Sequence, residues 1–342
     1  MDNYLEFELL PRRACEATRR NGDAGTTRHA ETGTRGREAT VTREQGDTWT
    51  RERREKKSDR RVSVSQRPRV PFITLLTDFG TSDYFVSAMK GVILSINPAA
   101  YVVDITHEIP AQDIESAAFT LMAAHSSFPF GTIHVAVVDP GVGSGRRAIL
   151  VEAGGQCFVG PDNGIFSYVC EGEPQARVFE VTNKEYFRAP VSSTFHGRDV
   201  FAPVAAALST GIDLSEFGEQ IINPVRLAPL IPEKSKNGTV KGRIIHIDRF
   251  GNCITNITPR DLTEKMITDG AYLAISDAKV KSFRKFFSEQ NGRGREVFAV
   301  WGSAGFLELA VKDKSAAKIL KAKRGQQVVL RMPRKLIQNR ER

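Results

Sequence analysis

The sequence predicts an α/β domain with a mostly parallel sheet, followed by a smaller β-barrel domain. Apolar runs of strand length alternate with helical periodicity from residue 72 to residue 208, and short apolar runs separated by turns follow from residue 239 onward. Alternating strands and helices favour a parallel sheet with helices on both faces. A series of short strands is typical of a small barrel or sandwich.

The first domain divides into elements at recognisable turn signals. A strand over 72–77 ends at the polar turn Asp78-Phe79-Gly80, and a helix over 82–96 ends at Asn97-Pro98. The other elements expected in this domain are strands at 101–105 and 132–138, a hairpin from 148–152 and 157–159, and helices at 114–125 and 201–208.

A stretch rich in proline and polar residues, 222–238, separates the two patterns. We therefore expect an α/β domain at 71–225, a linker at 226–238, a β-barrel domain at 239–334 and a tail at 335–342. The strands expected in the barrel are 239–248, 252–257, 271–275, 296–301, 306–311 and 327–332.

Residues 1–70 differ from the rest of the 342-residue chain. They carry 17 Lys and Arg against 12 Asp and Glu and show no hydrophobic periodicity, so they bury too little apolar surface to offset the entropy cost of ordering. We expect a disordered basic extension, or a start codon assigned too far upstream. The interspersed acidic residues weaken the case for an acidic partner and for an organelle transit peptide.

Composition also limits the class of protein. More than half of the formal charge of +9 belongs to residues 1–70, which argues against nucleic acid as a partner of the folded region. No stretch approaches the roughly 20 apolar residues that span a bilayer, and no signal-peptide core is present, so we expect a cytoplasmic protein with no membrane partner.

Neither a metal nor a cofactor is expected. The four cysteines have no zinc-site or disulfide spacing, and His107-Glu108 and His125 lack a metal-ligand frame. The glycine-rich stretch 141–145 has neither the spacing of a phosphate-binding loop nor that of a dinucleotide fingerprint.

Two short loops, 138–146 and 194–199, carry the most informative side chains. Asp139, Arg146 and His196 bring a carboxylate, a guanidinium and an imidazole onto glycine-rich backbone, which suits the orientation and polarisation of water. Since no serine or cysteine stands in a nucleophile elbow, activated water is favoured over covalent catalysis. From spacing alone, turn capping by Asp139 and Asp199 with local salt bridges remains an equal alternative.

Three further polar clusters follow predicted strands: residues 77–80 with Asp83, residues 248–252 and residues 301–305. Carboxylates can hold ribose hydroxyls or an ammonium group, asparagine can pair with a base edge, and phenylalanine offers a stacking face. For any single ring among Phe79, Phe195 and Phe250, a core position is favoured over a ligand contact. A nucleoside without phosphates is the ligand most consistent with these residues.

Five motifs, taken in order, resemble the S-adenosyl-L-methionine (SAM) hydrolase family, the SAM hydroxide adenosyltransferases, which are related to fluorinase and chlorinase. The motifs are Thr77-Asp78-Phe79-Gly80, Val138-Asp139-Pro140-Gly141-Val142-Gly143, Gly160-Pro161-Asp162-Asn163-Gly164, Thr194-Phe195-His196-Gly197-Arg198-Asp199 and Phe250-Gly251-Asn252. The resemblance covers about residues 72–332. It implies that water attacks the 5′-carbon of SAM and releases adenosine and L-methionine, in a homotrimer whose sites lie between one subunit's first domain and its neighbour's second.

The resemblance also implies a role for individual residues. Asp139, Arg146 and His196 match the family's water-positioning triad. The substrate-binding matches are Asp78 for the ribose, Phe250 and Asn252 for adenine, Asp83, Asp248 and Ser303 for the methionine end, and Phe195 beside the triad. Ala304 stands where the halogenases have an arginine for the carboxylate, and residues 311–315 depart from the family's Val-Asn-x-Gly-Asn.

Two alternatives remain. A SAM-dependent halogenase uses the same substrate, but fluorinase-like sequences carry tyrosine where Asp139 stands and Tyr-Ser where His196-Gly197 stands. An anionic Asp139 repels a halide ion and accepts a hydrogen bond from water. The other alternative is a non-catalytic SAM-binding sensor, against which the intact triad argues.

Overall fold

The computed structural model describes residues 71–235, 238–289 and 296–333, so the predictions for residues 1–70 and 335–342 lie outside the described residues. The first domain contains, in chain order, β1 (Phe72–Thr77), α1 (Phe85–Ile96), β2 (Tyr101–Thr106), α2 (Ile114–His125), β3 (Ile133–Val137), β4 (Ala148–Ala153), β5 (Gln156–Pro161), α3 (Ser167–Gly172), β6 (Arg177–Glu180), η1 (Lys184–Tyr186), η2 (Gly197–Phe201), α4 (Ala202–Leu208), η3 (Leu214–Phe217) and β7 (Gln220–Ile221).

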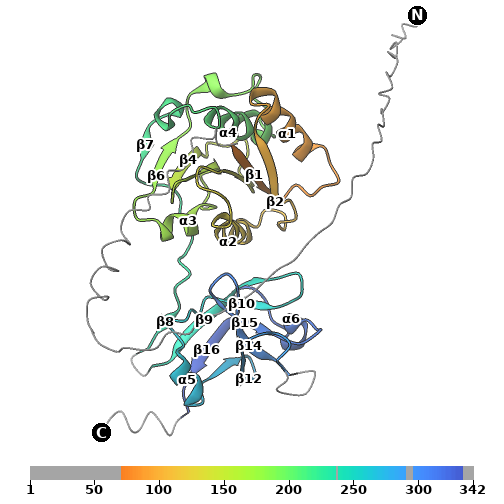
Figure 1. Cartoon of the computed structure of the whole chain (residues 1–342), viewed down its shortest axis with the longest axis vertical. Coiled ribbons are helices and arrows are strands. Elements are labelled where there is room, and N and C mark those ends of the chain that lie inside the picture. Colours follow the sequence, from red (N-terminus) through yellow and green to blue (C-terminus); the bar gives the residue numbers. More distant parts are fainter. Residues whose placement is uncertain (1–70, 236–237, 290–295, 334–342) are drawn as a thin grey trace, which may run out of the picture. The chain divides into compact units, whose positions relative to one another are not determined.

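These strands form one seven-stranded sheet in the order β2-β1-β3-β5-β4-β6-β7 (Figure 1). The pairings among β2, β1, β3 and β5 are parallel, as the sequence predicts. The pairings of β4 with β5, β6 with β4 and β7 with β6 are antiparallel. The two-glycine turn Gly154-Gly155 folds β5 directly back on β4. The α/β prediction is confirmed for a mixed sheet whose first half is parallel.

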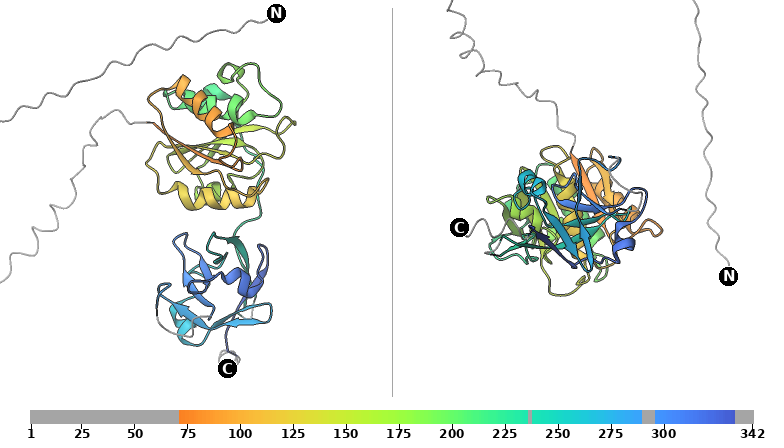
Figure 2. Two further views of the ribbon diagram at one scale, coloured as in Figure 1. Left: turned by 90° about the vertical axis from the view of Figure 1, so that its right-hand side faces the viewer. Right: turned by 90° about the horizontal axis from the view of Figure 1, so that it is seen from below.

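Helices cover both faces of this sheet. Helices α1 and α4 lie on one face and α2 and α3 on the other, and Figure 2 (left) shows strands between the two helix layers. Side chains of β3 alternate between the layers: Val135 and Val137 pack with α1 and α4, whereas Ala136 packs with α2. A strand buried on both faces therefore leaves only its ends free for chemistry.

Most of the predicted elements are present with shifted boundaries, and some short elements were not predicted. Helix α1 begins at Phe85 and not at residue 82, and its N-cap residue, Tyr84, makes no side-chain cap hydrogen bond. Helix α3 and strand β6 were not predicted, because elements of six and four residues are too short to show a clear period.

Gly160, in β5, packs closely against the neighbouring strand β3. A Cβ at this position would lie 2.3 Å from the backbone oxygen of Ala136 on β3 and 2.9 Å from the ring of Phe166. Glycine is required here because any side chain would push apart the strand that carries the first candidate loop and its neighbour.

The second domain is built from short strands around its own core. Its elements are β8 (Glu233–Lys234), β9 (Val240–Ile247), β10 (Cys253–Thr255), α5 (Glu264–Thr268), β11 (Tyr272–Ile275), β12 (Ala278–Val280), β13 (Ser282–Arg284), β14 (Phe298–Trp301), β15 (Leu307–Ala310), α6 (Ala316–Leu320) and β16 (Gln327–Arg331). The strand order is β12-β11-β16-β9-β10-β15-β14-β13, with β8 paired to β9. This barrel-like sheet confirms the predicted second architecture, and β8 lies within the segment predicted as linker.

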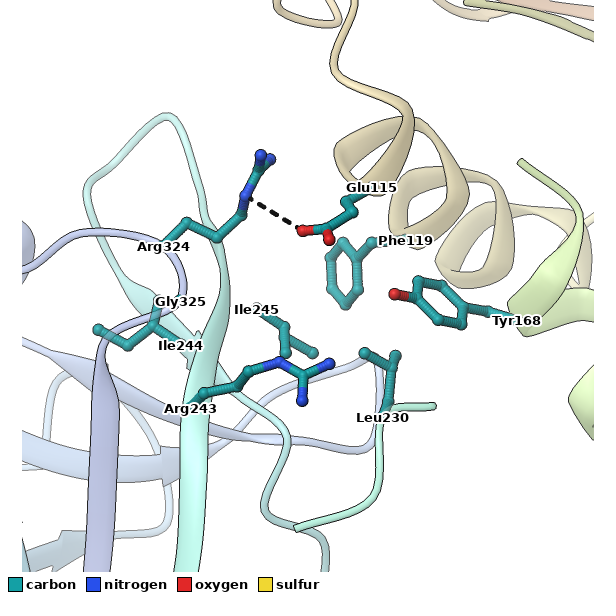
Figure 3. Close-up of a pocket in the computed structure, with 9 residues that line it drawn as sticks. All are labelled: Glu115, Phe119, Tyr168, Leu230, Arg243, Ile244, Ile245, Arg324 and Gly325. Atoms are coloured by element: carbon teal, nitrogen blue, oxygen red, sulfur yellow. Dashed lines mark ion pairs between the residues drawn. The ribbon is translucent and has the colours of Figure 1, made fainter. Parts of the chain in front are cut away.

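Arg324, which precedes β16, contacts helix α2 of the first domain. Its guanidinium donates to the carboxylate of Asp113, the N-cap residue of α2, and its Nε lies 3.7 Å from Glu115 (Figure 3). Phe119 of α2 stacks on His246 of β9, with ring centroids 4.8 Å apart. An ion pair and an aromatic stack thus join the two domains. In the part of the chain that the structure describes, no helix is long and apolar enough to cross a membrane.

The packing at Gly160 generates a stability prediction. Gly160→Ala should lower the free energy of unfolding by about 1–3 kcal/mol, because the added methyl overlaps the β3 backbone. The control is Gly172→Ala at the end of α3, where a Cβ meets nothing within 4 Å, and this change should be neutral or stabilising by up to about 1 kcal/mol. Urea unfolding of both variants measures the difference, and equal stability would contradict the packing argument.

Candidate active site

The first candidate loop leaves the carboxyl end of β3 in a series of tight turns. Val142 donates its backbone N–H to Asp139 O, and Ser144 donates its backbone N–H to Gly141 O. The side-chain amide of Asn163 donates to Val138 O at 2.8 Å, which fixes the point where the loop begins. The Asn163 motif therefore has a positioning role: it holds the strand end that carries Asp139.

Arg146 lies between Asp139 and His196 and contacts both. Its Nε is 3.0 Å from each carboxylate oxygen of Asp139, and its Nη2 also donates to this carboxylate. The same Nη2 lies 2.8 Å from His196 Nδ1. The side chains of Asp139 and Arg146 are only 5% and 12% exposed, so both charges are shielded from water and the pair is strong.

This geometry determines the tautomer of His196. A guanidinium only donates hydrogen bonds, so Nδ1 of His196 must accept and the proton of the neutral ring resides on Nε2. Burial lowers the pKa of His196, the positive charge of Arg146 lowers it further, and Asp139 and Asp199 oppose the shift only in part. His196 is therefore a neutral side chain that offers an N–H donor.

The second candidate loop is fixed by a buried carboxylate. Asp199 is fully buried and accepts hydrogen bonds from the side chains of Arg198 and Arg188 and from the backbone N–H of Ser192. Although burial alone would raise it, these donors lower the pKa of Asp199. Asp199 thus performs the structural role considered for it from the sequence, and it holds His196 at the start of the π-helical turn η2.

Gly143 brings the two loops together. A Cβ on this residue would lie 2.2 Å from the backbone oxygen of Ser193, and its φ of +76° favours glycine. The loop of Asp139 therefore packs directly against the loop of His196. Arg146 also lies over the ring of Phe201, 5.2 Å from its centroid, which restricts the guanidinium from a third side.

The loop after β1 carries Asp78 at the same edge of the sheet. The Asp78 carboxylate accepts the backbone N–H of Gln112 at 2.8 Å. Behind it, Thr77 Oγ1 lies 2.9 Å from His107 Nδ1 and accepts the N–H of Phe79. Sequence inspection assigned His107 no role, because a buried link between neighbouring strand ends has no periodicity signal.

Phe195 lies in an aromatic cluster with Phe79, Tyr84 and Phe85. Its ring centroid is 5.0 Å from that of Phe85 and 6.0 Å from that of Phe79, and the residue is only 6% exposed. This placement is typical of a side chain that supports a site from behind. Asp83, in contrast, is exposed on the loop before α1.

The site residues predicted in the second domain line one cavity of about 870 Å³. Asp248, Phe250, Asn252 and Ser303 all belong to its wall. Asp248 accepts both the backbone N–H and the side-chain amide of Asn252, at 2.8 and 2.9 Å, so these two residues form one polar unit. Phe250 is 78% exposed, which leaves its ring free to stack on a ligand.

Glu308, on β15, also lines this cavity and was missed from the sequence. Burial raises the pKa of Glu308, and the negative charge of Asp248 raises it further. Its carboxylate occupies the space where a Cβ of Gly302 would stand, which explains the glycine in the 301–305 turn. The sequence offers no sign of a binding role for Glu308, because a single acidic side chain between apolar residues of a strand usually faces solvent.

The predicted residues thus fall into two groups, one in each domain, and within the described residues no hydrogen bond or ion pair joins the groups. The described part of the chain also contains no group of three His, Cys, Asp or Glu side chains arranged to hold a metal ion.

A mixed α/β domain with an Asp-Arg-His cluster at a strand end, followed by a barrel with a polar and aromatic cavity, defines a two-domain enzyme. The chain belongs to the SAM hydroxide adenosyltransferase family: the N-terminal domain of that family matches residues 73–218, and its C-terminal domain matches residues 242–329.

Named relatives agree with this assignment. The (R)-S-adenosyl-L-methionine hydrolase of Methanocaldococcus jannaschii is 39% identical over 262 residues, which cover 72% of this chain and 91% of the relative. The enzyme of the same name from Thermus thermophilus is 36% identical, covering 75% and 98%. A fluorinase of an Actinoplanes species is more distant, at 29% identity over 56% and 73% of the two chains. An uncharacterised Thermotoga maritima protein of known crystal structure has a TM-score of 0.70 and 37% identity, covering 75% of this chain and 99% of that protein.

The contact between Arg146 and His196 generates a prediction about protonation. Arg146→Met should raise the pKa of His196, because the nearby positive charge is lost while Asp139 remains. Titration of the histidine ring protons by NMR measures the shift. The control is Arg147→Met, since Arg147 pairs with Asp162 and not with the cluster. A pKa of His196 that is unchanged or lower in the Arg146 variant would contradict the assigned contact.

Proposed function

We propose that this protein hydrolyses SAM to adenosine and L-methionine, with water as the nucleophile. The observation that carries the proposal is the contact of Arg146 with both Asp139 and His196 at the end of β3. The family of the chain and its relatives named SAM hydrolases support the same reaction.

The reaction needs no acid on its leaving group. The oxygen of water forms a bond to the 5′-carbon while the bond from that carbon to sulfur breaks, and the electron pair of the broken bond passes to sulfur. The sulfonium becomes a neutral thioether, and the attacking water releases one proton. Catalysis then depends on alignment of the water oxygen with the 5′-carbon. It also depends on stabilisation of the positive charge that develops on the attacking water.

The cluster can meet both requirements. A carboxylate has about four acceptor positions, and Arg146 uses three contacts with Asp139, so an acceptor remains for a water proton. The Nε2–H of His196 can donate to the water oxygen and orient it. In this scheme His196 is a hydrogen-bond donor, and the Asp139 carboxylate stabilises the positive charge that develops on the water oxygen and accepts the released proton.

The same carboxylate disfavours a halogenase. A chloride or fluoride ion at the position of the water would lie beside the negative charge of Asp139, in a region with little solvent to screen the repulsion. A non-catalytic SAM sensor would not need a buried cluster that leaves one carboxylate acceptor and one imidazole donor unused. Hydrolysis is therefore the function that the site supports best.

The substrate roles follow from the two groups of residues. We assign Asp78 to the ribose hydroxyls, Asp83 to the methionine end and Phe195 to the wall beside the water. In the second domain, the exposed Phe250 and the amide of Asn252 would receive adenine, while Asp248 and Ser303 would face the methionine end. A cytoplasmic location remains a prediction of the sequence.

We further propose that the two groups meet between subunits of a homotrimer. Each domain holds only part of the required chemistry: the water-orienting cluster is in the first domain, and the ligand-sized cavity is in the second. An assembly in which one subunit's first domain faces its neighbour's second domain would complete the site.

Product analysis tests the reaction. Purified protein incubated with SAM should form adenosine and L-methionine in halide-free and in chloride-containing buffer alike, as identified by liquid chromatography and mass spectrometry. A 5′-halo-adenosine would assign the protein as a halogenase, and unchanged SAM with measurable binding would assign it as a sensor.

The division of roles is tested by variants in the same assay. Asp139→Ala and His196→Ala should lower kcat by about 10²- to 10⁴-fold with little change in SAM affinity, whereas Asp78→Ala should mainly raise KM. His196→Gln retains an N–H donor and should keep more activity than His196→Ala, which distinguishes a donor from a general base. Equal loss of binding in Asp139→Ala, His196→Ala and Asp78→Ala would contradict the assignment.

The shared site predicts complementation. Asp139→Ala and Asp248→Ala proteins should each have little activity at SAM concentrations below KM, but co-expressed subunits should recover up to about one quarter of wild-type activity. In a random mixture, half of the first domains and half of the neighbouring second domains are intact. About one quarter of the shared sites therefore combine two intact domains. No recovery in mixed oligomers would place the complete site within one subunit.

A further inference from the structure

The cavity in the second domain carries both signs of charge on different loops. Asp248 and Glu308 supply acidic groups, while the loop between β15 and α6 supplies Lys312 and Lys314, with Asp313 between them. The aromatic side chains of Phe250 and Trp301 complete much of the remaining wall. A cavity of this composition suits a ligand end that is zwitterionic and adjoins an apolar part.

The acidic part of the cavity is fixed by its own contacts. Asp248 holds the amide of Asn252, and Glu308 packs against Gly302. The mutual repulsion of the two carboxyl groups is relieved if a cationic ligand group lies between or beside them. This side of the cavity therefore favours an ammonium group.

The lysine loop has a defined backbone. Lys314 donates its N–H to Val311 O, and Asp313 at the corner has a φ of +57°. The next residue, Ser315, caps α6 through its side chain and packs closely against Gly251. Since Ala317 also donates its N–H to Gly251 O at 2.9 Å, the lysine loop is attached to the loop of Asp248.

The turn at residues 302–305, which also contributes to the wall, supplies no cation. Residues 302–305 are Gly-Ser-Ala-Gly, so Ser303 can offer only a hydroxyl and Ala304 only a methyl group. Lys312 and Lys314 are the two basic residues in the described wall of the cavity, and both are exposed. Among the lining residues that the structure describes, the β15–α6 loop therefore supplies the cations that can neutralise a bound carboxylate.

We propose that Lys312 and Lys314 together bind the α-carboxylate of the substrate, while Asp248 and Glu308 receive its α-ammonium group, so that the cavity selects a complete amino-acid end. The inference rests on the proposed function, because SAM and its product L-methionine both carry this zwitterion. Both lysines belong to residues 311–315, where this chain departs from the Val-Asn-x-Gly-Asn motif of the family. The proposal therefore assigns carboxylate recognition to residues that differ from that motif.

The test compares SAM with decarboxylated SAM, which lacks only the carboxylate, in the full-length protein. Lys312→Gln/Lys314→Gln should lower kcat/KM for SAM by about 10- to 100-fold, mainly through KM, and should leave kcat/KM for decarboxylated SAM nearly unchanged. Lys318→Gln/Lys323→Gln is the matched control: it removes the same charge from exposed lysines that do not line the cavity, and both ratios should stay at the wild-type value.

Either of two results would overturn the proposal: an equal loss with both substrates, or no loss with SAM. If the wild-type protein hydrolyses neither substrate, the proposed function fails and calorimetry decides the lysine assignment separately. In the presence of adenosine, L-methionine should then bind more tightly than 3-(methylthio)propylamine to the wild-type protein. The lysine variant should lose this difference, and an unchanged difference would overturn the assignment.

Discussion

The contact of Arg146 with Asp139 and His196 is the interaction on which the rest of the first domain's site depends. The guanidinium neutralises a nearly buried carboxylate and at the same time determines which nitrogen of the imidazole carries the proton. Without this arginine, neither the carboxylate acceptor of Asp139 nor the Nε2–H donor of His196 would be correctly presented. The surrounding structure restricts this arginine from several sides, through the close approach of Gly143 to Ser193 and through the ring of Phe201.

The requirement for a fixed cluster explains several residues that do not touch a ligand. Asn163 holds the end of β3, and the buried Asp199 holds the loop that presents His196. Burial of Asp199 is tolerated because two arginines and a backbone N–H satisfy its oxygens. In the second domain, the cavity wall is held by close packing of Gly251 against Ser315 and of Gly302 against Glu308.

Much of the fold was predictable because its long elements show clear hydrophobic periods. The boundaries predicted for α2 and for β1 agree with the structure, and β3 is buried along its whole length as its apolar run indicates. The β4–β5 hairpin was predicted, but helix α3, strand β6 and the antiparallel pairings of β6 and β7 were not, because short elements and strand pairing depend on contacts distant in sequence.

The sequence by itself determined the two architectures, the family and the candidate chemistry, because periodicity and ordered motifs are local properties of a chain. Tertiary structure decided how those residues are used: Arg146 sets the tautomer of His196, Asp199 becomes a structural anchor, and Phe195 joins an aromatic cluster. It also brought Glu308 and Lys312 into one cavity with Asp248, although these residues are as many as 64 positions apart. Such groupings depend on packing between loops, and spacing along the chain carries no signal for them.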